Sequence, residues 1–306
     1  MSIIPTINIA PFYTGSDEAK QAVASQIGQA CQEIGFFTIS GHPVSQSLLT
    51  ELSQAAYAFF DLPLAEKNVV QKRTTGKGYM GLGIEHLAAS LDKAAISDYK
   101  ESLNLGLPVD PESWPKNPPQ LRTACETYIK TLQKLATDLV ELFALALDTP
   151  FSTFADKIDR PKMGLRLLDY PPMENPQPGQ TRAGEHTDYG ILTILWSENS
   201  RGLQAQNRAG EWVDVVAAPD EFIINIGDLM MNWTNDRWVS TLHRVVPPVE
   251  DLTNRRQSIP FFFNPNPDAI IECLDSCCSP TNPAKYPPVL ASKHHNLKKG
   301  KSLGET

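Results

Sequence analysis

The sequence predicts a mostly β fold with flanking α-helices, and two observations carry this prediction. Residues 1–160 contain amphipathic segments whose apolar side chains recur at helical spacing. From Leu165 onward the chain changes to short apolar runs that are separated by tight turns. A succession of short strands is what a double-stranded β-helix, or jelly roll, requires. We therefore expect a jelly-roll core with helices packed against it.

The first helix is expected over residues 18–35. Its apolar side chains, such as Ile27 and Ala30, recur at helical spacing, and Gly35 provides a stop signal. The run that follows, residues 36–39, is aromatic and β-branched, so it predicts a strand.

Two more helices and two other segments complete the N-terminal part. Residues 1–12 are expected to form a short strand ending at Pro11, and the polar, Gly-rich residues 67–83 a loop. The second helix is expected over 45–60. The third is expected over 120–147, where seven apolar side chains fall on one stripe: Leu121, Ala124, Tyr128, Leu132, Leu135, Leu139 and Leu142.

The strands of the second part are short. Residues 203–206 and 212–216 are expected to form a hairpin through a turn that contains Gly. Residues 222–227 are expected to form a buried strand. At its end we interpret Asn225 and Asp228 as structural residues without a chemical role.

The chain is expected to fold as one domain over residues 1–306. It contains no visible internal repeat and no linker, and its 306 residues with 41% hydrophobic composition are ample for a core. We divide the domain into a helix-rich part with the first strands (1–160), the jelly-roll core (161–270) and a C-terminal segment (271–306).

Composition excludes several functions. With a net charge of −8 and no basic patch in the body of the chain, nucleic acid is not an expected partner. The basic cluster in residues 293–301 is expected to be a solvated tail. The sequence shows neither an apolar leader nor a membrane span. An odd, scattered set of cysteines favours free thiols and a cytoplasmic protein; it comprises Cys31, Cys125, Cys273, Cys277 and Cys278.

Three residues are candidate metal ligands. In an extended segment His186 and Asp188 point to the same face, with Thr187 between them pointing away. His243 lies in a later strand-like run and could bring a second imidazole to the same point. Two His and one carboxylate leave coordination positions open, which is the arrangement of non-haem iron oxygenases. We refer to these three residues as the triad.

Arg256 and Ser258 form a candidate carboxylate receptor. If residues 256–258 are extended, the guanidinium and the hydroxyl share a face. An Arg can bind a carboxylate through two parallel hydrogen bonds. Because Arg256 follows His243 after a short loop, the two residues suit adjacent antiparallel strands.

These motifs make the chain recognisable. It resembles the isopenicillin N synthase-like branch of the 2-oxoglutarate- and Fe(II)-dependent oxygenases, because the triad and Arg256-x-Ser258 occur in the family's order and at plausible spacing. The resemblance covers nearly the whole chain and includes five further segments: residues 4–9, 31–42, 59–67, 78–81 and 165–172.

The resemblance implies an enzyme with three cofactors or co-substrates. The triad would bind Fe(II), Arg256 and Ser258 would hold the distal carboxylate of 2-oxoglutarate, and O2 would bind at the metal. Tyr170 stands where a phenol often adds a hydrogen bond to that carboxylate. Leu168 departs from the family, since plant members usually have Asn there. The implied reaction decarboxylates 2-oxoglutarate to succinate and CO2 and oxidises, most often by hydroxylation, a C–H bond of a small molecule.

The resemblance also suggests where the substrate binds. The loop over residues 67–83 would lie at the mouth of the pocket, so Tyr79, Met80 and Leu82 are candidate substrate contacts. Trp233, Trp238 and Phe263 are candidates for its apolar wall, and they are equally plausible as core. The sequence leaves the substrate and the oligomeric state open.

Two alternatives stay open at the level of the sequence. Isopenicillin N synthase has the same triad and uses a similar Arg-x-Ser for its substrate's own carboxylate, so the chain could be an oxidase that needs no 2-oxoglutarate, and desaturation or cyclisation could replace hydroxylation. A non-catalytic jelly-roll binding module is the other alternative. Its structural metal site would normally need a fourth protein ligand, which the sequence does not suggest.

Overall fold

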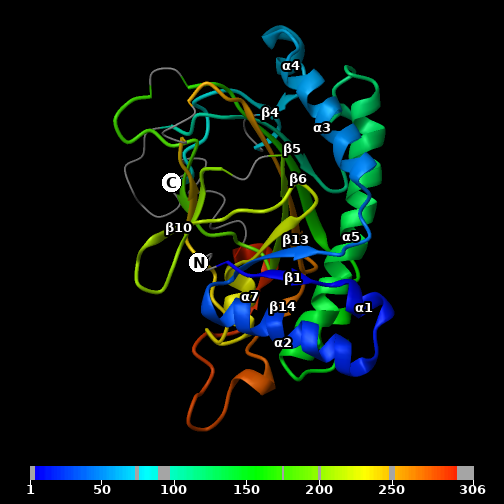
Figure 1. Cartoon of the computed structure of the whole chain (residues 1–306), viewed down its shortest axis with the longest axis vertical. Coiled ribbons are helices and arrows are strands. Elements are labelled where there is room, and N and C mark those ends of the chain that lie inside the picture. The colour runs from blue at the N-terminus through cyan, green and yellow to red at the C-terminus, as the bar shows by residue number, and fades with distance from the viewer. Residues whose placement is uncertain are drawn as a thin grey trace.

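Figure 1 shows a computed structural model of the protein, which describes residues 4–72, 76–88, 97–173, 176–198, 201–247 and 252–294. The helices are α1 (Ala10–Thr14), α2 (Asp17–Glu33), α3 (Gln46–Phe60), α4 (Leu64–Asn68), α5 (Gln120–Ala146), α6 (Ser152–Ala155) and α7 (Asp228–Trp233), with short 3-10 helices η3 (Pro111–Ser113) and η4 (Asp275–Cys277). The strands are β1 (Thr6–Asn8), β2 (Phe36–Ser40), β3 (Gln71–Lys72), β4 (Lys77–Met80), β5 (Glu101–Gly106), β6 (Lys162–Tyr170), β7 (Ala183–His186), β8 (Leu192–Ser197), β9 (Leu203–Gln206), β10 (Trp212–Asp214), β11 (Phe222–Ile226), β12 (His243–Val245), β13 (Arg256–Asn264), β14 (Ile270–Ile271) and β15 (Val289–Leu290).

Two sheets form the core. The larger sheet has the strand order β1-β2-β11-β8-β13-β6-β5-β4-β3, and the smaller has the order β10-β9-β12-β7. One apolar cluster joins them. It contains Phe36, Leu168 and Leu195 of the larger sheet and Ala183, Leu203 and Val245 of the smaller. Two mostly antiparallel layers, with β1 and β2 as a parallel pair, enclose an apolar interior, which is the expected jelly-roll core, so the predicted fold class is confirmed.

The helices cover the opposite face of the larger sheet, and α5 is the longest of them (Figure 1). It packs against α2, α3, β8 and β13. Its apolar stripe is buried as predicted, with Leu132, Leu135 and Leu139 all 0% exposed. Burying one such side chain contributes about 1.5–3 kcal/mol. The larger sheet, which carries Arg256 and Ser258 on β13, is therefore held between a helical layer and the smaller sheet, which carries His186 and His243.

Two local expectations were wrong in detail. Residues 67–83 are not all loop. β3 and β4 pair there, and β4 pairs with β5, so both strands belong to the larger sheet. The first strand ends at Asn8, since Pro11 lies in the first turn of α1 instead of closing the strand. Asp228 begins α7, so the chain after β11 turns directly into a helix.

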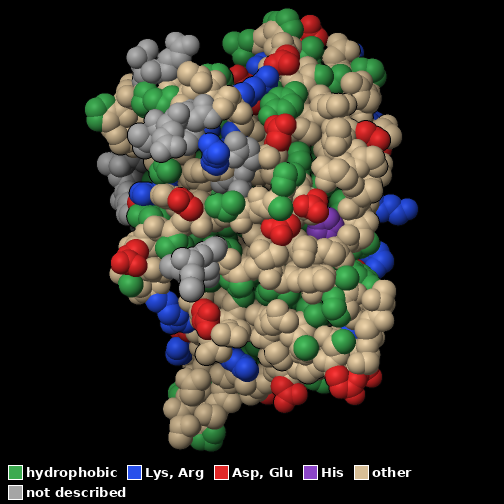
Figure 2. All heavy atoms as spheres, in the orientation of Figure 1, with side chains coloured by type: hydrophobic (Ala, Val, Ile, Leu, Met, Phe, Trp, Pro, Cys, Tyr) green, Lys and Arg blue, Asp and Glu red, His purple; other side chains and the backbone are tan. Residues whose placement is uncertain are grey.

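The remaining features are the cysteines, the surface charges and the lengths of the helices. In the described part of the chain, no helix is both long and apolar enough to cross a membrane. All five cysteines are free thiols. On the face drawn in Figure 2, basic side chains lie between acidic ones. Of the basic segment 293–301, residues 295–301 lie outside the described residues.

Candidate metal centre and its two cavities

The two histidines of the triad meet because β7 and β12 pair. His243 is the direct partner of His186 in this antiparallel register. Their ring centroids lie 4.2 Å apart. Asp188 follows β7 by two residues, and one ligand atom from each of the three residues lies within 4.8 Å of the others. The structure thus brings together all three residues that the sequence selected as metal ligands.

Both imidazoles are held in one tautomer by backbone carbonyls. Nδ1 of His186 donates to the carbonyl oxygen of Gly184 at 2.7 Å, and Nδ1 of His243 donates to that of Thr241 at 3.0 Å. Each Nε2 is left for the centre of the site. Burial and the neighbouring His243 lower the pKa of His186 to about 4, so its imidazole is neutral near pH 7. A neutral imidazole is the form that binds a metal.

The carboxylate of Asp188 is oriented by two donors on one oxygen. Its Oδ2 accepts from Thr193 Oγ1 at 2.5 Å and from Asn225 Nδ2 at 2.7 Å. Its Oδ1 faces His243 Nε2 at 3.9 Å. Burial raises the pKa of Asp188, but His243, His186 and the two donors lower it further than burial raises it. The group is therefore an ionised ligand with one oxygen directed to the imidazoles.

Asn225 was misjudged from the sequence. We interpreted it as a structural residue at a strand end, whereas its amide contacts the Asp188 carboxylate. The available signal was a single polar side chain within the apolar run of β11. Asp228 agrees better with the interpretation as a structural residue. It begins α7, and its backbone N–H donates to the carbonyl oxygen of Asp188 at 2.8 Å.

A glycine permits this close approach. A Cβ at Gly227 would lie 2.5 Å from the carbonyl oxygen of Gly190 and 2.8 Å from that of Asp188. Real Cβ contacts are not this short, so a side chain at Gly227 would push α7 away from the loop that carries Asp188. The geometry of the triad therefore depends on a residue that has no side chain.

The candidate carboxylate receptor lies on β13 beside β6. Arg256 pairs in register with Tyr170, and Ser258 pairs with Leu168. The guanidinium carbon of Arg256 lies 5.0 Å from the centre of the Tyr170 ring. Burial lowers the pKa of Arg256, while Tyr170 raises it. A carboxylate ligand would offset the cost of burying this cation.

An inner cavity connects the triad with this receptor. The triad, Arg256, Ser258 and Tyr170 all line it, together with Leu168. Leu168 occupies the position where the resembled family usually has Asn, and it contributes an apolar surface there. Six residues chosen from the sequence therefore surround one space between the two sheets.

The donor set fits Fe(II). It provides two imidazole nitrogens and one carboxylate oxygen within 4.8 Å of one another, which is the two-histidine, one-carboxylate set of non-haem iron centres. Among the described residues this is the only such group of His, Cys, Asp and Glu, and it has three members. A closed structural site would normally have four protein ligands.

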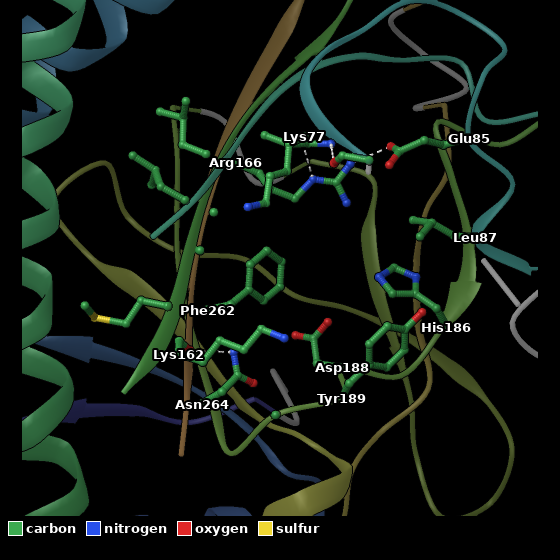
Figure 3. Close-up of a pocket in the computed structure, with 18 of the residues that line it drawn as sticks. Lys77, Glu85, Leu87, Lys162, Arg166, His186, Asp188, Tyr189, Phe262 and Asn264 are labelled. Carbon is green, nitrogen blue, oxygen red and sulfur yellow. Dashed lines mark hydrogen bonds and ion pairs between the residues drawn. The ribbon is translucent and has the colours of Figure 1, made fainter. Parts of the chain in front are cut away.

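A larger outer cavity of about 380 Å³ adjoins the triad (Figure 3). Its volume is in the range of small-molecule sites. His186 and Asp188 stand on one side, and Arg166 and Lys77 on the other. Phe262 lies between them, and Glu85 stands beside Arg166.

Apart from His186 and Asp188, the sequence did not identify the residues of this cavity. Tyr79 and Met80 are buried and Leu82 is 45% exposed, and none of the three is among its described lining residues. Trp233 and Trp238 pack as core against Phe154 and Phe143. Phe263 is also core, and its neighbour Phe262 lines the cavity instead. Neighbouring side chains in a strand point to opposite faces, so a one-residue error in facing changed the assignment.

Comparison with known families gives two matches. Residues 4–126 match the family described as non-haem dioxygenase in morphine synthesis N-terminal, and residues 161–265 match the 2OG-Fe(II) oxygenase superfamily. The second match contains every residue of the triad and of the carboxylate receptor. The first contains Lys77 and Glu85 of the outer cavity.

Individual relatives match almost end to end. A 2-oxoglutarate-Fe(II) type oxidoreductase of Emericella nidulans is 33% identical, covering 93% of this chain and 86% of its own. A homoarginine-6-hydroxylase of Oryza sativa subsp. japonica is 31% identical, covering 95% and 94%. The crystal structure of a full-length Neurospora crassa protein with alpha-KG and thymine superposes with a TM-score of 0.88 at 28% identity, covering 99% of this chain and 97% of that chain.

Proposed function

The chain belongs to the 2OG-Fe(II) oxygenase superfamily, and on that premise we propose that the triad holds Fe(II) and that Arg256, Ser258 and Tyr170 hold 2-oxoglutarate. The protein is an enzyme that uses Fe(II), 2-oxoglutarate and O2. It oxidises a C–H bond of a small molecule and converts 2-oxoglutarate to succinate and CO2. The observation that carries the assignment is the convergence of His186, Asp188 and His243 within 4.8 Å.

Each part of the site has a separate task. Fe(II), when bound, offers open coordination positions for the keto acid and O2. Arg256 binds the distal carboxylate through its guanidinium, and the Ser258 hydroxyl and the Tyr170 phenol add hydrogen bonds. The apolar side chains of Phe36, Leu195 and Val245 line the same cavity and exclude water. Asn225 acts as a positioning residue, since it fixes the carboxylate of Asp188.

The outer cavity is proposed as the site of the primary substrate, and hydroxylation as the outcome. Relatives of this chain are named for hydroxylation of homoarginine, and the Neurospora crassa protein has been crystallised with thymine. These names support a small-molecule substrate without identifying one. The alternative of an oxidase without 2-oxoglutarate is not favoured, because the relatives are named as 2-oxoglutarate enzymes. A binding module with a structural metal is not favoured by the three-ligand group.

The test is an anaerobic titration of the metal-free protein with Fe(II) and then 2-oxoglutarate. The chelate is expected to give a weak visible absorption band near ~500 nm, as in the iron chemistry of this family. His243→Ala should lose both iron and band, whereas Arg256→Ala should keep iron and need more 2-oxoglutarate. Iron binding without a band at saturating 2-oxoglutarate would overturn the co-substrate assignment. Normal iron retention in His243→Ala would overturn the metal assignment.

We also propose that residues 1–306 act as one catalytic domain in the cytoplasm. The larger sheet takes strands from both residues 1–160 and residues 161–270, which supports one folding unit. The five free thiols support a reducing compartment. Limited proteolysis should give no fragment of residues 1–160 that keeps its structure, and a stable fragment would contradict the single domain.

A further inference from the structure

The outer cavity exists because two glycines face each other. Gly106 on β5 and Gly164 on β6 are partners in register, and both line the cavity. The side chain of Lys77 crosses this bare part of the sheet, since a Cβ at Gly106 would lie 3.1 Å from Lys77 Cε. The ammonium group can therefore reach the cavity from the neighbouring strand β4.

Arg166 is a fixed cation between the two cavities. It lines both of them, and its side chain is 19% exposed. Nε donates to Asn104 Oδ1 at 2.8 Å, and Nη2 donates to Glu85 Oε2 at 2.5 Å. Among the described residues, no hydrogen-bond acceptor is found for Nη1. Asn104, Glu85 and Ser102 thus restrain the guanidinium while one of its nitrogens stays available to a ligand in the cavity.

The acid beside Arg166 is already neutralised. Glu85 Oε2 lies 2.5 Å from Arg166 Nη2 and 3.5 Å from Lys100 Nζ. Burial raises the pKa of Glu85, but these two cations lower it to about 2. Glu85 is therefore ionised and already paired. The positive charges of Arg166 and Lys100 would repel a cationic group of a substrate at this position.

The charge balance of the cavity is positive at the end away from the metal. At that end its described lining contains two cations, Lys77 and Arg166, against one acid, Glu85, whereas Lys162 extends towards Asp188 at the metal end (Figure 3). Asp188 belongs to the triad, and Glu85 is paired with Arg166. Apolar side chains, Leu87, Met163, Leu165 and Phe262, form much of the remaining wall.

We propose that the primary substrate is a small carboxylic acid with an apolar body, and that Arg166 and Lys77 bind its carboxylate. This proposal rests on the proposed function. The apolar body would lie along Phe262 and Leu87, and the C–H bond to be oxidised would lie at the opposite end, beside His186 and Asp188 (Figure 3). Arg166 and Lys77 then determine specificity, because they set which end of the substrate faces the metal.

If the Arg166–Glu85 ion pair had a purely structural role, a different result would be expected. Buried ion pairs contribute little net stability relative to apolar side chains, and charged groups with shifted pKa values in a cleft are often functional. A structural pair would not require Lys77, which makes no ion pair with the described residues and lies on β4, separated by β5 from Arg166 on β6. Effects of Lys77 on ligand charge preference therefore separate the two roles.

The experiment uses phenylacetate, hydrocinnamate, phenylbutyrate and octanoate as probes, each beside its primary amide and the corresponding amine. Each is titrated anaerobically into the full-length protein loaded with Fe(II) and 2-oxoglutarate, and the apparent Kd is read from the change in the visible band. Aerobic succinate release is measured in parallel. The best acid should bind about ten- to a hundredfold tighter than its amide, because a charge-assisted pair is lost in the amide.

Variants assign the effect to the two cations. Lys77→Gln should weaken acid binding about two- to fivefold, as expected for a partly exposed pair. Lys77→Glu should reverse the preference between the acid and the amine. Lys130→Gln, at an exposed lysine of α5 outside the cavity, is the matched control and should change nothing. The double variant Glu85→Gln with Arg166→Gln replaces the ion pair by two amides and should weaken acid binding about tenfold or more.

The outcomes are decisive in either direction. Amides or amines that bind as well as the acids, no acid that changes the band, or an unaltered preference in Lys77→Glu would each overturn the proposal. Failure of the proposed function looks different, because the band itself would be missing before any probe is added. If the double variant does not fold, Lys77→Glu still decides, since that side chain is exposed.

Discussion

Replacing Asn225 by Leu tests how the metal-binding carboxylate is held. The Asn225 amide is buried, 3% exposed, and donates to Asp188 Oδ2 at 2.7 Å. A hydrogen bond to an ionised acceptor contributes about 1.5–3 kcal/mol, which corresponds to a factor of about 10–150 in an equilibrium constant. Comparable losses of about 10–100-fold follow removal of groups that support metal ligands. We therefore expect the Kd for Mn(II), a spectroscopic substitute for Fe(II), to rise by at least about tenfold.

The assay is an anaerobic Mn(II) titration followed by electron paramagnetic resonance. Thr193→Val removes the other donor to the same oxygen and should weaken Mn(II) binding to a similar degree. The double variant should lose more than the sum of the two, because each remaining donor partly compensates for the other. Thr50→Val, at an exposed position of α3, is the control. A folded Asn225→Leu protein with an unchanged Kd would refute the reasoning.

Three further predictions concern the cavities and pH. Gly164→Val should fold, because a Cβ there lies 3.9 Å from Phe262 Cδ2, and should abolish substrate-stimulated succinate release while the visible band with 2-oxoglutarate persists; retained stimulation would place the substrate elsewhere. Arg256→Ala should raise the KM for 2-oxoglutarate roughly a hundredfold, and Arg256→Lys should restore part of the loss. Steady-state kinetics measures both, and an unchanged KM in Arg256→Ala would contradict the prediction. Glu85, whose pKa lies at about 2 against an ordinary 4.5, contributes stability above its ordinary pKa and loses it as pH falls towards about 2. The difference in free energy of unfolding between the wild type and Glu85→Gln should therefore shrink by on the order of 3 kcal/mol over that range. Urea unfolding at several pH values measures it, and a difference that does not change with pH would contradict the prediction.

The parts of the fold that the sequence predicted are those with a strong local signal. The stripe of α5 extends over 27 residues, so its period is unmistakable. The two ligands His186 and Asp188 are close in the chain, and the alternation of an extended segment is enough to place them on one face. Arg256 and Ser258 follow the same rule on β13. These predictions needed no knowledge of which strands are neighbours.

The parts that the sequence did not predict depend on pairing between distant strands. Asn225 reaches Asp188 because β11 lies beside β8 in the larger sheet, which also brings Thr193 to the carboxylate. Arg166 meets Glu85 across 81 positions of the chain. The choice between Phe262 and Phe263 is of the same kind, because which of the two side chains faces the outer cavity depends on the register of β13 against β6.

One strand, β6, connects the substrate cavity with the 2-oxoglutarate site. Along β6, Arg166, Leu168 and Tyr170 alternate with residues of the opposite face, and all three line the inner cavity. Arg166 also lines the outer cavity, and Tyr170 lies against Arg256. A shift of this strand by one residue would turn all three side chains away together. Substrate preference and 2-oxoglutarate binding should therefore be lost together when the register of β6 changes, yet separately when Arg166 or Tyr170 is replaced, because each side chain serves one end of the same continuous face.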